Sequence, residues 1–137
     1  MLHIPADDAR AVAIVRAIRS GDAGALQRQL HDNPDLAAAR VVDDRGVSRT
    51  LLHIVADWPG HVPHGPGIVA TLVAAGADVN AGVMNPGPKG SPATALHWAA
   101  SSGDVGVLDA LLDRGADIEA PGAAFTGGAP MSDAVEF

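Results

Sequence analysis

The segment TALHWAASSGD at residues 94–104, followed by LLDRGADIEA at 111–120, has an earlier copy in the same chain. The copy reads TLLHIVA at 50–56 and VAAGADVNA at 73–81. Two matched segments in the same order are typical of a tandem repeat, in which each unit buries its apolar face against its neighbours. We therefore expect a repeat fold.

The spacing within each copy locates two insertions. From Thr94 to Gly115 there are 21 positions and from Thr50 to Gly76 there are 26, so the earlier copy carries five extra residues. The segment 82–93 is also longer than the pattern requires. Closing a longer loop costs little additional entropy, so we expect one insertion between two helices and the other in the turn between repeats.

Both copies resemble the ankyrin repeat, a unit of about 33 residues with a turn and two antiparallel helices. A fainter copy precedes them, with Val15 in place of the repeat histidine and a charged outer face that includes Arg16 and Arg19, which suits a terminal cap. The resemblance implies an all-α solenoid of stacked helix-turn-helix units with long finger loops. The expected single domain, 1–137, comprises a degenerate capping repeat at 7–49, a repeat with inserts at 50–93, a regular repeat at 94–126 and the start of a fourth repeat at 127–137.

Helix caps and apolar stripes support these helices independently of the resemblance. Asp22 and Asp104 each follow a glycine and are well placed as N-caps, worth about 1 kcal/mol each. Gly76 and Gly115 end the second helices, where glycine adopts the left-handed conformation without steric penalty. Two apolar stripes at helical spacing are expected to be buried: Ile68, Val69, Leu72 and Val73, and Val105, Leu108, Leu111 and Leu112.

The first helices carry a threonine and a histidine at fixed spacing. Thr50 and Thr94 are predicted to cap these helices. In ankyrin proteins the histidine three residues later bonds this threonine and nearby backbone, so the resemblance gives His53 and His97 a structural role. The expected structural repeat motif is Thr50, His53, Gly76, Thr94, His97, Gly103 and Gly115.

Composition narrows the function classes. The chain has 9 Lys and Arg against 16 Asp and Glu, a net charge of −7, which disfavours nucleic-acid binding. It has no Cys, which excludes disulfides and thiolate metal sites, and its start lacks the regions of a signal peptide. No stretch approaches the ~18 apolar residues of a membrane span. We expect a cytoplasmic protein without nucleic-acid or membrane contacts, and the abundance of Ala and Arg favours a bacterial source.

Two segments superficially suggest ligand sites. Asp57, His61 and His64 have side chains that suit zinc, but the prolines and glycines around them predict an irregular, solvated loop. The segment 82–91 is rich in glycine like a phosphate-binding loop, but its lysine is misplaced and its prolines lack N–H donors. A small metal-binding protein remains a third hypothesis. We expect no metal, no cofactor and no catalytic residue, because neither a serine elbow nor a cysteine nucleophile is present.

The leading hypothesis is a non-enzymatic module that binds a protein partner of unknown identity. Ankyrin proteins usually bind on the concave side, through finger tips and the ends of the first helices. Trp58 is prominent because aromatic residues dominate interface hot spots, although it could instead pin its own insert against the repeat. Trp98 is expected to pack between helices. The predicted partner-binding residues are Arg19, Ser20, Arg45, Arg49, Asp57, Trp58, Met84, Lys89, Ser101 and Ser102.

A second hypothesis treats the chain as the N-terminal regulatory or structural ankyrin segment of a longer protein with an enzymatic domain. The sequence stops inside the expected fourth repeat, which would leave an apolar face uncovered. Met131, Val135 and Phe137 could cover one another across a symmetric contact, so a homodimer through this repeat is also an expectation.

Overall fold

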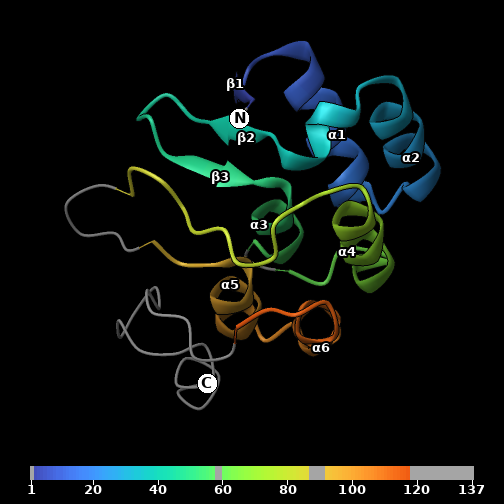
Figure 1. The fold of residues 1–137 in the computed structure, drawn as a ribbon, viewed down its shortest axis with the longest axis vertical. Helices are drawn as coiled ribbons and strands as arrows, with labels where there is room; N and C mark the ends of the chain where they lie inside the picture. The colour runs from blue at the N-terminus through green and yellow to red at the C-terminus, as the bar shows by residue number, and fades with distance from the viewer. Residues whose placement is uncertain (1, 58–59, 87–91, 118–137) are drawn as a thin grey trace.

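The computed structural model describes residues 2–57, 60–86 and 92–117, which form paired helices and a small sheet (Figure 1). The expected fourth repeat at 127–137, with Met131, Val135 and Phe137, lies outside the described residues. In each pair the two helices contact each other. The pairs are α1 (Ala9–Ser20) with α2 (Ala23–Asp32), α3 (Leu51–Ala56) with α4 (Gly65–Ala74), and α5 (Ala95–Ser102) with α6 (Val105–Asp113).

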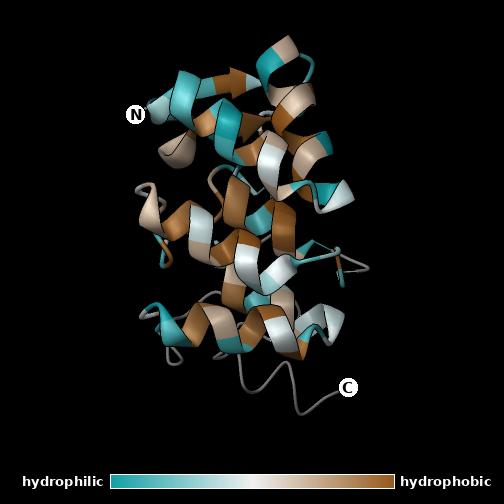
Figure 2. Ribbon diagram, turned by 90° about the vertical axis from the view of Figure 1, so that its right-hand side faces the viewer, coloured by the Kyte–Doolittle hydropathy of each residue, from teal (hydrophilic) through white to brown (hydrophobic). Residues whose placement is uncertain are grey.

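The helix pairs stack as successive layers, which Figure 2 shows from the side. The first helices form one column, in which α3 contacts both α1 and α5. The second helices form another, in which α4 contacts both α2 and α6. A short 3-10 helix, η1 (Pro34–Ala38), follows α2 and contacts it. The sequence-based expectation of a helical repeat is therefore confirmed.

The all-α expectation is wrong at the N-terminal finger, which contains a sheet. Its strands are β1 (His3–Pro5), β2 (Arg40–Val42) and β3 (Ser48–Thr50), in the order β1-β2-β3. β1 runs parallel to β2, and β2 runs antiparallel to β3. Strand pairing provides hydrogen-bond partners for the backbone N–H and C=O groups of a long finger. Without the pairing, these groups would be left unpaired where the finger is buried.

The next finger pairs with this sheet. Ser48 and Met84 exchange two backbone hydrogen bonds of 2.8 Å each. The buried Arg40 side chain crosses between the fingers, where Nη1 donates to the carbonyl oxygen of Gly82 at 2.9 Å. Inserted residues in the second finger therefore extend the hydrogen-bonded layer that begins with β2 and β3.

The predicted caps are confirmed. The Asp22 side chain accepts from the Ala25 N–H at the start of α2, and the Asp104 side chain accepts from the Val107 N–H at the start of α6. Gly76 and Gly115 have φ values of 117° and 94°, in the left-handed region that favours glycine. Asp104 also accepts a 2.7 Å hydrogen bond from the backbone N–H of His61, so the insert between α3 and α4 is held against the following repeat.

The predicted apolar stripe is correct for α4 and partly wrong for α6. Val105 is 65% exposed, whereas Val107 and Leu111 are buried. α6 packs against α4, and this contact turns Val107 inward. Val107 Cγ2 comes so close to Gly65 that a Cβ added there would lie 2.9 Å from it. α6 is therefore turned so that the i, i+4 pair Val107 and Leu111 faces inward, while Leu108 and Leu112 are only partly buried.

The described helices are short. The longest, α1, has 12 residues, and none in residues 2–57, 60–86 and 92–117 is both long and apolar enough to span a bilayer.

Gly21 and Gly103 allow a matched test of how closely the insert packs. Their φ values are 72° and 71°, but a methyl group at Gly21 would overlap Pro63, while nothing lies within 4 Å of one at Gly103. Gly103→Ala should cost about 1–2 kcal/mol through left-handed strain alone. Gly21→Ala should cost about 1–3 kcal/mol more, because Pro63 must also move. Urea unfolding measures both values, and equal losses would contradict this packing.

Candidate functional site

A hollow of about 640 Å³ opens where α1 passes the β2–β3 hairpin and α3. We call it the α1 groove. Its wall includes apolar side chains from three different elements, and its rim carries guanidinium groups. It is lined by Ala6, Val12, Val15, Arg16, Arg19, Ser20, Val41, Asp43, Arg49 and Ile54.

The register of α1 decides which of its side chains reach the groove. Ala11, Ile14, Ala17 and Ile18 are buried in the core. Val12, Val15, Arg16 and Arg19 recur at i, i+3, i+4 and i+7, so they share a different face of the same helix. This face turns two valines and two arginines toward the groove. Arg16 and Arg19 are exposed, as the expected charged face requires, and this face borders the groove.

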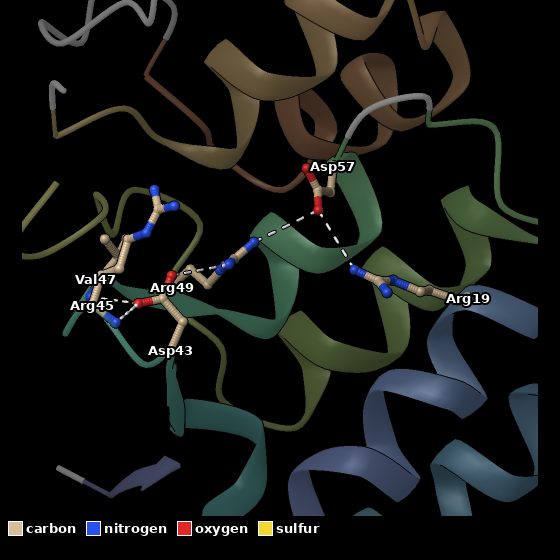
Figure 3. A network of polar contacts seen from close by, with 6 residues as sticks. All are labelled: Arg19, Asp43, Arg45, Val47, Arg49 and Asp57. Atoms are coloured by element: carbon tan, nitrogen blue, oxygen red, sulfur yellow. Dashed lines mark hydrogen bonds and ion pairs between the residues drawn. The ribbon is translucent and has the colours of Figure 1, made fainter. Parts of the chain in front are cut away.

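Four charged side chains form a chain of ion pairs along the groove (Figure 3). Arg19 from α1 and Arg49 from β3 approach the same Asp57 oxygen from opposite sides, at 3.6 and 3.7 Å. Arg49 also meets Asp43 at 3.5 Å. These distances are long and the groups are partly exposed, so each pair contributes at most about 1 kcal/mol.

Asp43 connects this network to the shape of the finger. Its Oδ1 accepts from the backbone N–H groups of Arg45 and Val47, at 2.9 and 3.0 Å, and so closes the turn between β2 and β3. Its other oxygen, Oδ2, faces Arg49. One carboxylate therefore shapes the hairpin and holds the arginine that projects from it.

Arg49 also contacts the Trp98 ring, which packs on the ring of His53. Its guanidinium carbon lies 5.9 Å from the centre of the Trp98 ring, within the range of a cation–π contact. Trp98 in turn packs edge-on against His53, with ring centroids 4.8 Å apart and an interplanar angle of 73°. The expected packing role of Trp98 between first helices is confirmed, because His53 lies on α3 and Trp98 on α5.

His53 makes the contacts predicted for the repeat histidine. Its Nδ1 accepts from the backbone N–H of Thr50 at 3.2 Å, so Nε2 carries the ring proton and donates to the Ala93 carbonyl at 2.8 Å. Burial lowers the pKa of His53 to about 4, and the positive charges of Arg40 and Arg49 act in the same direction. His97 repeats the threonine contact, with Nδ1 at 3.0 Å from the Thr94 nitrogen.

The structure brings several predicted partner-binding residues together. Arg19, Ser20 and Arg49 line the α1 groove, and Asp57 lies between the two arginines. Asp57 and Arg19 also line an adjoining hollow of about 420 Å³ beside Gly60 and His61. The Ser20 hydroxyl itself donates to the Ala17 carbonyl of its own helix.

Other predicted residues lie elsewhere. Met84 is 43% exposed on the second finger, and the Arg45 side chain is exposed at the tip of the first. Ser102 donates to the carbonyls of Ala56 and Ala99, which ties α5 to α3. Ser101 has a buried hydroxyl without a hydrogen-bond partner within the described residues. Trp58 and Lys89 lie outside the described residues.

Sequence reasoning missed the apolar wall of the groove, which consists of Val12, Val15, Val41 and Ile54. A signal for the first two was present, because they stand off the buried stripe of α1 at positions that share a face with Arg16 and Arg19. No comparable signal marks Val41 or Ile54, since both read as ordinary apolar residues of a strand and a helix.

The structure describes only part of the two segments that superficially suggest ligand sites. Within residues 2–57, 60–86 and 92–117, no three His, Cys, Asp or Glu side chains converge as metal ligands. Asp57 faces two arginines, and His61 and His64 lie in a loop with left-handed φ values of 60° and 59°. Part of the glycine-rich segment 82–91, residues 87–91, lies outside the described residues.

Comparison with known proteins gives one family match. Residues 93–123 match the family model of the ankyrin repeat, and this range contains all of α5 and α6. No curated protein matches the chain.

The low pKa of His53 predicts acid sensitivity. An unfolded His53 binds a proton below about pH 6.5 while the folded one does so only near pH 4, so the unfolded state binds more protons between these values and stability falls as pH falls. The loss should approach about 3 kcal/mol for this residue. His53→Gln should show a correspondingly shallower decline in the free energy of unfolding, measured by urea titration at several pH values.

The control is His31→Gln, since His31 is exposed on α2. It should leave the pH dependence of the wild type unchanged. Parallel curves for the wild type and His53→Gln would contradict the assignment of this acid sensitivity to His53.

Proposed function

We propose that this chain, whose residues 93–123 match the ankyrin repeat, binds a protein partner through its concave face and finger loops, with the α1 groove as the main contact. Ankyrin repeats generally act as protein–protein interaction modules, and their stacked units present extended concave surfaces. The observation that carries the proposal is the α1 groove, a hollow of about 640 Å³ in which the exposed Val12 and the partly buried Val15 lie beside three arginines.

The proposed contact surface has two parts. Around the α1 groove it comprises Arg19, Ser20, Arg49 and Asp57. At the fingers and the end of α5 it comprises Arg45, Met84, Ser101 and Ser102, together with Trp58 and Lys89 from outside the described residues. Open apolar side chains such as Val12 would supply desolvation energy, and the charged rim would supply specificity.

The same proposal treats the chain as non-enzymatic. Ankyrin repeats are typically non-catalytic, and four charged side chains at the α1 groove, those of Arg19, Asp43, Arg49 and Asp57, pair with one another. The cytoplasmic location, the bacterial source and the homodimer through the last repeat stay predictions from the sequence.

A double variant tests this function. Val12→Gln with Arg19→Ala removes an apolar and a cationic contact from exposed positions of α1, so the fold should survive. The matched control is Val105→Gln with Arg114→Ala, the same two changes at exposed positions of α6 and its C-terminal cap. Proteins captured by the wild type from source-cell lysate should be retained by the control and reduced about tenfold by the groove variant, equivalent to about 1.4 kcal/mol.

Melting temperatures of all three proteins should be compared first, so that loss of capture is not loss of fold. Equal capture by the groove variant and the control would contradict binding at the α1 groove. Loss of capture with both variants would do the same.

A further inference from the structure

The α1 groove carries a charge opposite to that of the chain. The net charge of the protein is −7, yet the groove is lined by the guanidinium groups of Arg16, Arg19 and Arg49. The carboxylates beside them are those of Asp43 in the lining and Asp57 between two of the arginines, so positive charge is in excess. A local cationic site on an acidic protein attracts acidic groups and repels basic ones.

Two of these guanidinium groups are available to an incoming ligand. Arg16 is exposed, and its side chain makes no ion pair or hydrogen bond to any other described residue. Arg19 has a side chain that is 58% exposed, and among the described residues it forms an ion pair only with Asp57, at 3.6 Å. An external carboxylate can replace so weak a contact at little cost. Arg49 is different, because Asp43, Asp57 and the Trp98 ring all hold it in place.

The open face of α1 carries two valines, Val12 and Val15, followed by two arginines, Arg16 and Arg19. Val12 lies one helical turn before Arg16, and Val15 lies one turn before Arg19. Val12 is 42% exposed, which leaves its surface available for a contact. Val41 and Ile54 continue the apolar wall on the far side of the groove.

The volume limits the occupant. A hollow of about 640 Å³ is in the range of small-ligand sites and takes in a few side chains, not a folded surface. An occupant that satisfies both parts of the lining presents apolar side chains to the valines and carboxylates to the arginines.

Resting on the proposed function, we infer that the α1 groove binds a short segment of a partner protein that carries both acidic and apolar side chains. The carboxylates of the segment bind Arg16 and Arg19, whose planar guanidinium groups can each donate two parallel hydrogen bonds. Its apolar side chains pack on Val12 and Val15. Arg49 acts as a fixed positive charge behind them.

Selection from a displayed library of random twelve-residue peptides tests this inference without assuming a sequence. The immobilised bait is the full 137-residue chain. Enriched peptides should carry a net negative charge and combine Asp or Glu with Leu, Ile, Val, Met or Phe. Peptides with a neutral or basic consensus, or no enrichment, would overturn the inference.

An enriched peptide is then synthesised with a fluorescent label and titrated by anisotropy. Arg16→Ala with Arg19→Ala should raise Kd about tenfold or more, since two charge-assisted contacts are lost. The control, Arg28→Ala with Arg114→Ala, removes the same charge from exposed positions outside the groove and should change Kd less than about twofold. Raising the salt from about 50 to about 500 mM should weaken binding several-fold.

Three outcomes of the titration would overturn the inference. The first is an equal loss of affinity with both double variants, and the second is no loss with either. The third is that polyglutamate binds as tightly as the selected peptide, because binding would then depend on charge alone. If the selected peptides lack acidic residues and still bind the Val12→Gln variant more weakly than the wild type, that result would overturn the acidic segment, while the groove would remain a site for a partner. The proposed function fails separately, through the lysate capture test.

Discussion

The fold depends on a histidine that must stay neutral where the second and third helix pairs meet. His53 donates from Nε2 to the carbonyl of Ala93, 40 positions further along the chain, while its Nδ1 accepts from Thr50. A second proton would place N–H against N–H at Thr50 and would leave a charge in a site that is fully buried. A charged ring would keep the Nε2 bond to Ala93 but lose the Nδ1 acceptor at Thr50, so only the neutral ring makes both contacts.

This constraint reaches the α1 groove through direct contacts. Trp98 packs on the His53 ring, and Arg49 lies over Trp98. Arg49 then meets Asp57, which also receives Arg19 from α1. The charged rim of the groove thus rests on the same ring that joins the repeats. Thr50 is both the last residue of β3 and the N-cap of α3, so the finger strand and the helix are directly coupled. Arg49 precedes Thr50 in β3, and its ion pairs are therefore coupled to both elements.

Features set by local chemistry could be predicted from the sequence, and features set by packing between elements could not. Asp22, Asp104 and Thr50 cap their helices because a cap needs only its own neighbours. The sequence did not predict the sheet, because β1 pairs with β2 across 37 positions, from His3 to Arg40. No local sequence pattern indicates a pairing over such a distance. The sequence prediction placed Val105 in the core because periodicity gives the spacing of apolar residues along a helix. It does not give the rotation of α6 about its own axis, which the contact with α4 determines.

The α1 groove shows the same division. Sequence comparison with the repeat pattern selected Arg19, Ser20, Arg49 and Asp57, and the structure places these residues together, but their role in binding stays a prediction. The measurement that tests the central claim most directly is a long-range ¹H–¹⁵N NMR spectrum of the histidine rings, followed from pH 7 downward. For His53 we expect one tautomer, protonated on Nε2 and not on Nδ1, that keeps its shifts until the pH nears about 4. A mixture of tautomers at pH 7, or titration near the ordinary value of about 6.5, would contradict a neutral histidine that joins the repeats.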